Sequence, residues 1–152
     1  MAGQGGDKQH SPKRGKHKKF TLRYPEHVLN PEDLLNFVEL PAFTRRWEAL
    51  GLDDDQDLSA LQIFVMLGPK RHAIVKGTQG LRKLRFAPQR WNCGKSGAAR
   101  VLYVYFERYG MVLLCLVYAK NEVDTISNAV KQYLNTLVQE IECELAQRFS
   151  AG

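Results

Sequence analysis

The chain has 152 residues, of which 44% are hydrophobic and 25% are charged, and its formal net charge is +6. These values are ordinary for a globular protein with one domain. The longest apolar run, residues 111–119, is too short to span a bilayer, so we expect a cytoplasmic protein that does not bind membranes. The cysteines, 3 in number, are widely spaced and form no CxxC pair, which argues against a disulfide framework or a zinc site.

Charge is divided sharply along the sequence. The segment from Gly68 to Phe106 holds nine Lys or Arg residues and no Asp or Glu, whereas residues 24–67 hold two basic and nine acidic residues. Basic residues confined to one segment can form a positive face, and such a face suits a polyanion. The central segment is therefore the first candidate for a functional surface.

The N-terminal residues 1–36 are predicted to be a basic, disordered extension, and residues 37–150 are predicted to be the folded domain. Residues 1–19 contain no large apolar side chain after Met1, so they cannot contribute to a core. Their positive charge suits nucleic acid without sequence preference. The alternative interpretation is a solvated tail with no specific role.

Two helices are predicted after a short strand at residues 37–40. The first covers residues 41–50, where large apolar side chains recur at helical spacing, and Gly51 is placed to end it. The second follows the acidic run of residues 53–57 and ends at Gly68. We interpret the acidic run as capping of the second helix, because it lacks the glycine and the distal glutamate of a calcium loop.

The second half of the chain predicts strands and one long helix. Four strand-like segments with short connections indicate an antiparallel meander: residues 73–75, 81–87, 100–107 and 112–120. Apolar residues with a spacing of 3.6 then predict a C-terminal helix with Asp124 as its N-cap; its stripe contains Ile126, Val130, Tyr133, Leu134, Leu137, Ile141, Leu145 and Phe149. The predicted fold class is α+β, with two short N-terminal helices and the long C-terminal helix packed on an antiparallel sheet.

Strand alternation places part of the positive charge on one face. In residues 81–86, Lys83 and Arg85 point to one side of the strand, and Leu84 and Phe86 point to the other. Arg100 begins the next strand and Lys120 ends the last one, so both can reach the same neighbourhood if the strands pair in order. Four clustered cations favour a phosphate ligand. The alternative is a row of solvated cations on a sheet face, which is common.

The loop at residues 88–97 adds further candidates for nucleic-acid binding. The RNA-binding candidates are Arg82, Arg90, Trp91 and Lys95. Trp91 can stack on an unpaired base, or it can fold back onto the core. The tripeptide at residues 94–96 resembles the end of a nucleotide-binding phosphate loop, but Gln89 replaces the required glycine and a strand follows. We therefore exclude ATP and GTP binding, and we expect no metal and no cofactor.

Three sequence blocks carry a resemblance to a known family. They are residues 77–87 (GTQGLRKLRFA), 94–106 (GKSGAARVLYVYF) and 118–122 (YAKNE). In order and spacing they resemble the RelE/HigB family of bacterial toxins from type II toxin-antitoxin systems. The resemblance covers about residues 37–147 and implies the RelE-like fold.

The resemblance also implies an activity and partners. It implies a ribosome-dependent endoribonuclease, or mRNA interferase, that cuts mRNA in the ribosomal A site without a metal ion. The ribose 2′-OH would attack the neighbouring phosphate and leave a 2′,3′-cyclic phosphate. The implied partner is an antitoxin protein with a helix-turn-helix, encoded next to the toxin, and DNA would be bound only through that antitoxin.

The implied catalytic residues are Lys83, Arg85, Arg100 and Lys120. The chain departs from the family at Asn121, where a basic residue is usual, and at Ser127, near which the family carries a tyrosine. The proton-transfer candidates that remain are Glu122, Tyr105 and Tyr118. The alternative function is a catalytically weakened module of the same fold that binds RNA, the ribosome or the antitoxin.

Overall fold

The computed structural model describes residues 20–21, 28–91, 97–120 and 126–151, in two compact units, Met1–Leu35 and Asn36–Gly152. In the first unit, strand β1 (Phe20–Thr21) pairs antiparallel with β2 (Val28–Leu29), and a 3₁₀ turn, η2 (Pro31–Asp33), follows. These elements fall within the segment that the sequence predicts to be disordered. Residues 1–19 of that segment lie outside the described part of the chain.

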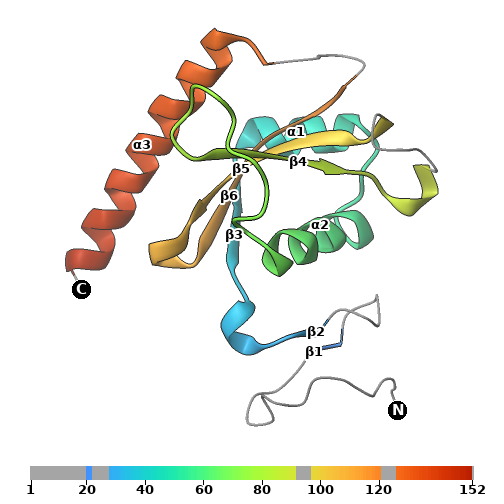
Figure 1. Ribbon diagram of the computed structural model, residues 1–152, viewed down its shortest axis with the longest axis horizontal. Helices are drawn as coiled ribbons and strands as arrows, with labels where there is room; N and C mark the ends of the chain where they lie inside the picture. The colour runs from blue at the N-terminus through green and yellow to red at the C-terminus, as the bar shows by residue number, and fades with distance from the viewer. Residues whose placement is uncertain (1–19, 22–27, 92–96, 121–125, 152) are drawn as a thin grey trace. The chain divides into compact units, whose positions relative to one another are not determined.

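The second unit is built on a four-stranded sheet with the order β3-β6-β5-β4 (Figure 1). Strands β4 (Leu81–Phe86), β5 (Ala99–Phe106) and β6 (Met111–Ala119) are antiparallel neighbours, which confirms the predicted meander for these three. Strand β3 (Asn36–Glu39) instead pairs parallel with β6. Parallel pairing requires a long crossover, and the whole chain between β3 and β6 provides it. The predicted α+β class is confirmed.

Two helices and the sheet enclose an aromatic core. Helix α1 (Pro41–Ala49) buries Phe43 and Trp47, whose rings stack at 5.4 Å between centroids. Trp47 also stacks on Phe86 of β4 at 5.8 Å. Helix α2 (Gln56–Leu67) buries apolar side chains next to this core. The aromatic stack fixes the position of α1 against the sheet.

The acidic run before α2 caps the helix, as predicted. The Asp53 Oδ1 atom accepts hydrogen bonds from the backbone N–H groups of Gln56 (2.8 Å) and Asp57 (3.0 Å). These are donors that a helix N-terminus leaves without intrahelical partners. Gly51, with φ +76°, ends the preceding helix in the left-handed conformation that glycine favours.

The C-terminal helix, α3 (Asn128–Ala151), begins later than the sequence predicts. Ser127 is its N-cap, because the Ser127 Oγ atom accepts a hydrogen bond from the Val130 N–H at 3.2 Å. Asp124, the predicted cap, lies outside the described residues. Serine is as favourable as aspartate at a helix N-cap, because its hydroxyl oxygen also accepts a hydrogen bond from a backbone N–H group.

The apolar stripe of α3 is only partly buried. Leu134, Val138 and Leu145 pack in one cluster with Leu81 and Leu102 of the sheet. In contrast, two aromatic members of the predicted stripe are mostly exposed: Tyr133 (66%) and Phe149 (60%). The buried face is therefore rotated from the predicted stripe, toward Val138.

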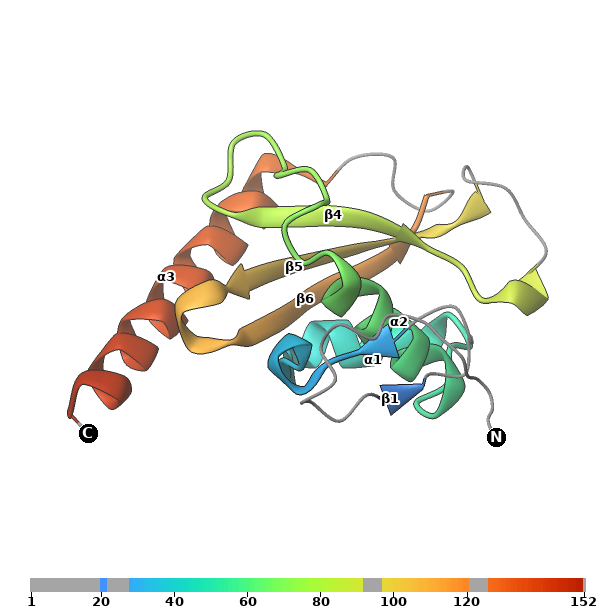
Figure 2. The same cartoon turned by 60° about the horizontal axis from the view of Figure 1, so that its bottom comes forward.

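The helices cover opposite faces of the sheet. Leu81 packs in the cluster with α3, whereas Phe86, which alternation places on the other side of β4, packs on α1. Figures 1 and 2 show α3 separated from α1 and α2 by the strands. No helix in the described part of the chain is long and apolar enough to cross a membrane.

One predicted strand is wrong. Residues 73–75 form no ladder; Ile74 makes a single antiparallel bridge to Arg82 at the free edge of β4. Glycines with positive φ at positions 77 and 80 turn the chain immediately afterwards, so the segment is too short to pair further. It is a connecting segment along the edge strand.

Candidate functional site

The alternation predicted for β4 is observed. Lys83 and Arg85 are exposed, whereas Leu84 and Phe86 are only 2% and 8% exposed. The two apolar side chains anchor the strand in the core, and this fixes the direction of the two cations. β4 is an edge strand, so the cations lie where a ligand can approach.

A row of side chains crosses the sheet at the end of β4. Arg85 lies directly opposite Arg100 in the β4–β5 register, and Arg100 lies opposite Tyr118 in the β5–β6 register. Arg100 is 7% exposed, and its Nη1 atom donates a hydrogen bond of 2.6 Å to the Ala98 carbonyl. Like charges directly opposite each other on a sheet repel. An anion bound beside both guanidinium groups would remove that repulsion.

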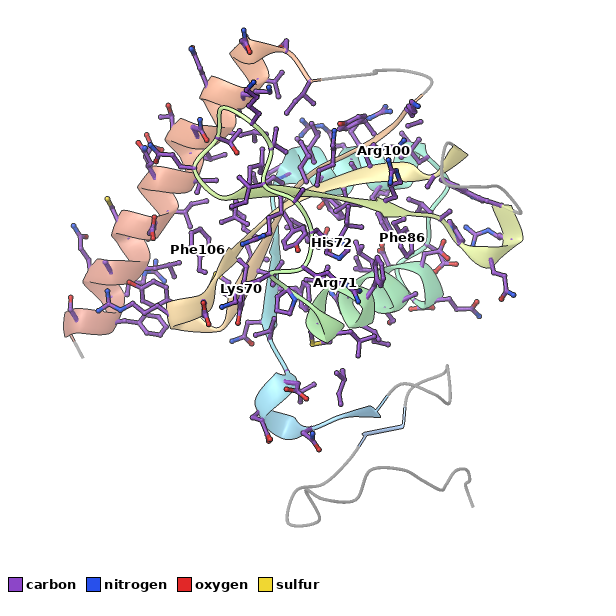
Figure 3. The ribbon with its side chains drawn as sticks, viewed as in Figure 1. Lys70, Arg71, His72, Phe86, Arg100 and Phe106 are labelled. Atoms are coloured by element: carbon purple, nitrogen blue, oxygen red, sulfur yellow. The ribbon has the colours of Figure 1, made fainter. Side chains whose placement is uncertain are left out.

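The four predicted catalytic cations line one open cavity of about 670 Å³. It lies along the edge strand β4, and Figure 3 labels Arg100, Arg71 and His72 near this edge. Its lining residues are Phe64, Arg71, His72, Ala73, Lys83, Leu84, Arg85, Arg100 and Lys120. None of these described residues carries a carboxylate. The cavity is therefore a positive site for a ligand larger than a bare phosphate.

The second wall of the cavity is the segment of residues 69–73, which follows α2. Hydrogen bonds from the sheet fix its carbonyl groups: Tyr103 Oη to Pro69 O (2.7 Å), Arg82 Nη1 to Lys70 O (3.1 Å) and His72 O (2.7 Å), and Lys83 N to Ala73 O (3.1 Å). A connecting segment held by so many sheet donors is rigid. The side chains that it carries are therefore presented in defined positions.

Arg71 is one of two basic or titratable residues of the cavity lining that the sequence analysis missed. Its guanidinium carbon lies 5.3 Å from the centroid of the Phe64 ring, within the range of a cation–π contact. Arg71 is not among the candidates from the sequence, because a sequence does not reveal that the segment after α2 folds back along β4. One indication of a role in the site is present in the sequence: Arg71 lies in the segment from Gly68 to Phe106, which holds no Asp or Glu.

His72 is the second missed residue. Its ring packs against Phe64 (5.2 Å between centroids) and Tyr103 (6.2 Å), and its Nε2 atom is buried without a hydrogen-bond partner among the described residues. Burial lowers the pKa of the imidazole, and the charges of Arg71 and Arg82 lower it further. His72 is therefore uncharged at neutral pH.

The proton-transfer candidates are placed differently from one another. Tyr118 is beside Arg100 but only 4% exposed, and its hydroxyl has no hydrogen-bond partner among the described residues. Burial raises its pKa, against a lowering effect of Arg100. Tyr105 is opposite Val112, further along β5, and neither tyrosine is among the residues that line the cavity. Glu122 lies outside the described residues.

The RNA-binding candidates lie apart from the cavity or at its margin. Arg82 supports the segment of residues 69–73 through two carbonyl groups. Arg90, in the 3₁₀ turn η3 (Gln89–Trp91), binds both carboxylate oxygens of Asp57 at 2.7 and 2.6 Å. Trp91 is half-buried, and Lys95 lies outside the described residues.

The Arg90–Asp57 pair gives Arg90 a structural contact that the sequence did not predict. Asp57 is 4% exposed, and the hydrogen bond with Arg90 holds the pKa of its carboxyl group below the usual range, despite the opposing effect of burial. Arg90 also donates to the Gly51 carbonyl at 3.1 Å. The pair joins the loop after β4 to the N-terminus of α2.

Comparison with known proteins gives one limited result. No known family profile matches the chain. The structure is similar to that of an arginine-to-alanine double mutant of the E. coli toxin RelE in the free state, with a TM-score of 0.48 and 18% sequence identity. The alignment covers 65% of this chain and 97% of that chain. At this level of similarity, function has to be inferred from the cavity itself.

Proposed function

We propose that the protein is the toxin of a type II toxin-antitoxin system and cleaves mRNA as a ribosome-dependent endoribonuclease. One observation carries the proposal. Four cations line one cavity whose described residues include no carboxylate: Lys83 and Arg85 of β4, Arg100 of β5, and Lys120, which directly follows β6. The three-block sequence resemblance points to the same four residues.

The proposed reaction is an internal transesterification. The ribose 2′ oxygen attacks the adjacent phosphorus, the bond from phosphorus to the 5′ oxygen breaks, and the products carry a 2′,3′-cyclic phosphate and a 5′-OH. One proton leaves the 2′ oxygen and one is delivered to the 5′ oxygen. The cations stabilise the extra negative charge of the pentavalent phosphorane.

Proton transfer is assigned to Tyr118 or to Glu122. Tyr118 adjoins Arg100, and Glu122 follows Lys120 by two positions in the sequence. A buried phenol beside a guanidinium group can donate a proton to the leaving oxygen when substrate displaces its neighbours. The proposed partners are mRNA in the ribosomal A site and a helix-turn-helix antitoxin, through which DNA is bound indirectly.

The direct test is induction of the protein alone in a bacterial host. We expect growth arrest and new 5′-OH ends in translated messages, and we expect these ends to disappear when initiation is blocked. Arg85→Ala should abolish the arrest. The matched control is Arg45→Ala, which removes an exposed arginine from α1, away from the cavity lining. Normal growth with intact messages in the wild type would refute the proposal.

A second function is favoured by one observation. The Tyr118 hydroxyl is buried, and Asn121 and Ser127 stand where the family carries other residues. A module that binds ribosomes or RNA without cutting would have these features. It would sediment with ribosomes with a steep dependence on salt and would produce no cyclic-phosphate ends.

A further inference from the structure

We propose that Arg71, held against Phe64, forms a stacking platform for one nucleobase of the bound RNA. The proposal rests on the proposed function, because it assumes that the strand cations hold a phosphate of the same RNA. It assigns the base-binding part of the site to the segment after α2. It concerns residues that neither the sequence analysis nor the chemistry of cleavage requires.

The first step of the argument is the position of Arg71. Its guanidinium carbon lies 5.3 Å from the centre of the Phe64 ring. A Cβ atom added at Gly68 would lie 3.1 Å from the Arg71 Cβ and 3.2 Å from its Nε. The side chain therefore contacts both the Phe64 ring and the Gly68 backbone, and it is exposed in the lining of the cavity. Gly68 has φ −166°, so it is not required for its backbone conformation. We infer that its role is to leave room for Arg71.

The second step is the rigidity of the backbone that carries Arg71. The Arg71 N–H donates to the Gly68 carbonyl at 3.0 Å, and Arg82 donates to the carbonyl groups on both sides of Arg71, at Lys70 and His72. A long side chain normally loses rotamer freedom when it binds a ligand. Here the cation–π contact with Phe64 and the fixed backbone restrict Arg71 before the ligand arrives.

The third step is the division of the cavity into two walls. One wall is formed by β4, which supplies Lys83 and Arg85. The other wall is formed by Phe64 of α2 and by Arg71 in the segment that follows α2. Cations on a strand suit phosphate oxygens, whereas an arginine plane supported by an aromatic ring suits the flat face of a base. A cavity of about 670 Å³ has room for both parts of a nucleotide.

The test is a binding experiment with RNA that cannot be cut. Short single-stranded oligonucleotides with 2′-O-methyl ribose would be titrated into the full chain, and a series with one abasic position each would be compared. We expect base removal at one position to weaken binding by wild type about 10-fold, the scale of one stacking contact. In Arg71→Ala, removal of the same base should have almost no further effect.

Arg71→Lys separates stacking from charge. It keeps the positive charge but loses the guanidinium plane. If Arg71 stacks on a base, the lysine variant loses the sensitivity to base removal. If Arg71 only attracts a phosphate, the lysine variant behaves as wild type, and the proposal is overturned. Gly68→Ala should reduce the sensitivity to base removal in part, because the added methyl group would lie 3.1 Å from the Arg71 Cβ atom and the arginine side chain must shift to accommodate it.

Arg108→Ala is the matched control. Arg108 makes the second cation–π contact of the described chain, 5.5 Å from the Tyr109 ring, and neither residue lines the cavity. This variant should bind and discriminate as wild type. Equal costs of base removal in wild type and Arg71→Ala would overturn the inference even if mRNA is cut in cells. Coupling without any cutting would support it and refute the proposed nuclease.

Discussion

Arg85 on β4 lies directly opposite Arg100 on β5, so two arginine residues face each other on the edge strand and its neighbour. Such a pair opposes folding, because like charges at facing positions destabilise a sheet by about 0.2–1 kcal/mol. A positive pair is useful only when an anion lies beside it. Under the proposed function, an anion bound in the cavity would offset this repulsion, and the loss of stability would be an example of a trade-off between stability and activity.

Removal of the exposed member of this pair should affect stability and activity in opposite directions. We expect Arg85→Ala to raise the free energy of unfolding slightly and to lower RNA cleavage by about 100-fold, the scale for one transition-state donor. Urea unfolding and the quantification of 5′-OH ends measure the two effects. Arg45→Ala should change neither. A loss of both stability and activity in Arg85→Ala would show that the arginine is a structural residue.

The Arg90–Asp57 pair predicts a strong asymmetry between single and double variants. Arg90→Ala leaves the carboxylate of Asp57 buried without its main partner, so the urea midpoint at pH 7 should fall clearly. The double variant with Asp57→Asn should recover part of the loss, because no uncompensated charge remains. Lys70→Ala, which removes a pair with Glu107 that is exposed on both sides, should have little effect. Equal losses in the single and double variants would contradict this account.

His72 predicts a dependence of stability on pH. The folded state lowers the pKa of its imidazole from the ordinary value of 6.5. The unfolded chain therefore binds more protons just below that value, and stability should fall as the pH decreases below about 6.5. His72→Gln should flatten this part of the profile, measured by unfolding midpoints from pH 7.5 to 5. An equally steep profile in His72→Gln would contradict this account.

Tyr118 gives a prediction that separates packing from catalysis. Its buried hydroxyl has no hydrogen-bond partner among the described residues, and leaving such a group unsatisfied costs about 1–3 kcal/mol. Tyr118→Phe should therefore raise the free energy of unfolding. If Tyr118 donates the proton to the leaving oxygen, the same variant cuts RNA at least 10-fold more slowly. Unchanged cleavage would remove Tyr118 from the reaction and leave Glu122 as the candidate.

Local patterns predicted the part of the site that strands carry. Alternation in β4 placed Lys83 and Arg85 on one face, and short connections brought Arg100 and Lys120 to the same end of the sheet. The pattern is reliable here because Leu84 and Phe86 must be buried. The same reasoning predicted the capping of α2 by its acidic run.

Contacts between distant segments escaped the sequence analysis. Arg71 and His72 reach the cavity only because the segment after α2 folds back along β4, and Arg90 meets Asp57 across 33 positions of sequence. No local periodicity reports such contacts. The strand predicted at residues 73–75 is wrong for a related reason. The β-branched residues that favour a strand also suit a single bridge at the edge of a sheet.

The parallel pairing of β3 with β6 sets the order in which the domain can be completed. It joins residues 36–39 to residues 111–114, so β3 cannot pair in the sheet before β6 has been synthesised. During synthesis, β4, β5 and β6 must all have left the ribosomal tunnel before the sheet closes, and contacts so distant in sequence form slowly. The positive cavity is assembled by the same three strands. A nascent chain therefore cannot carry a finished site until β6 has been translated and has left the tunnel.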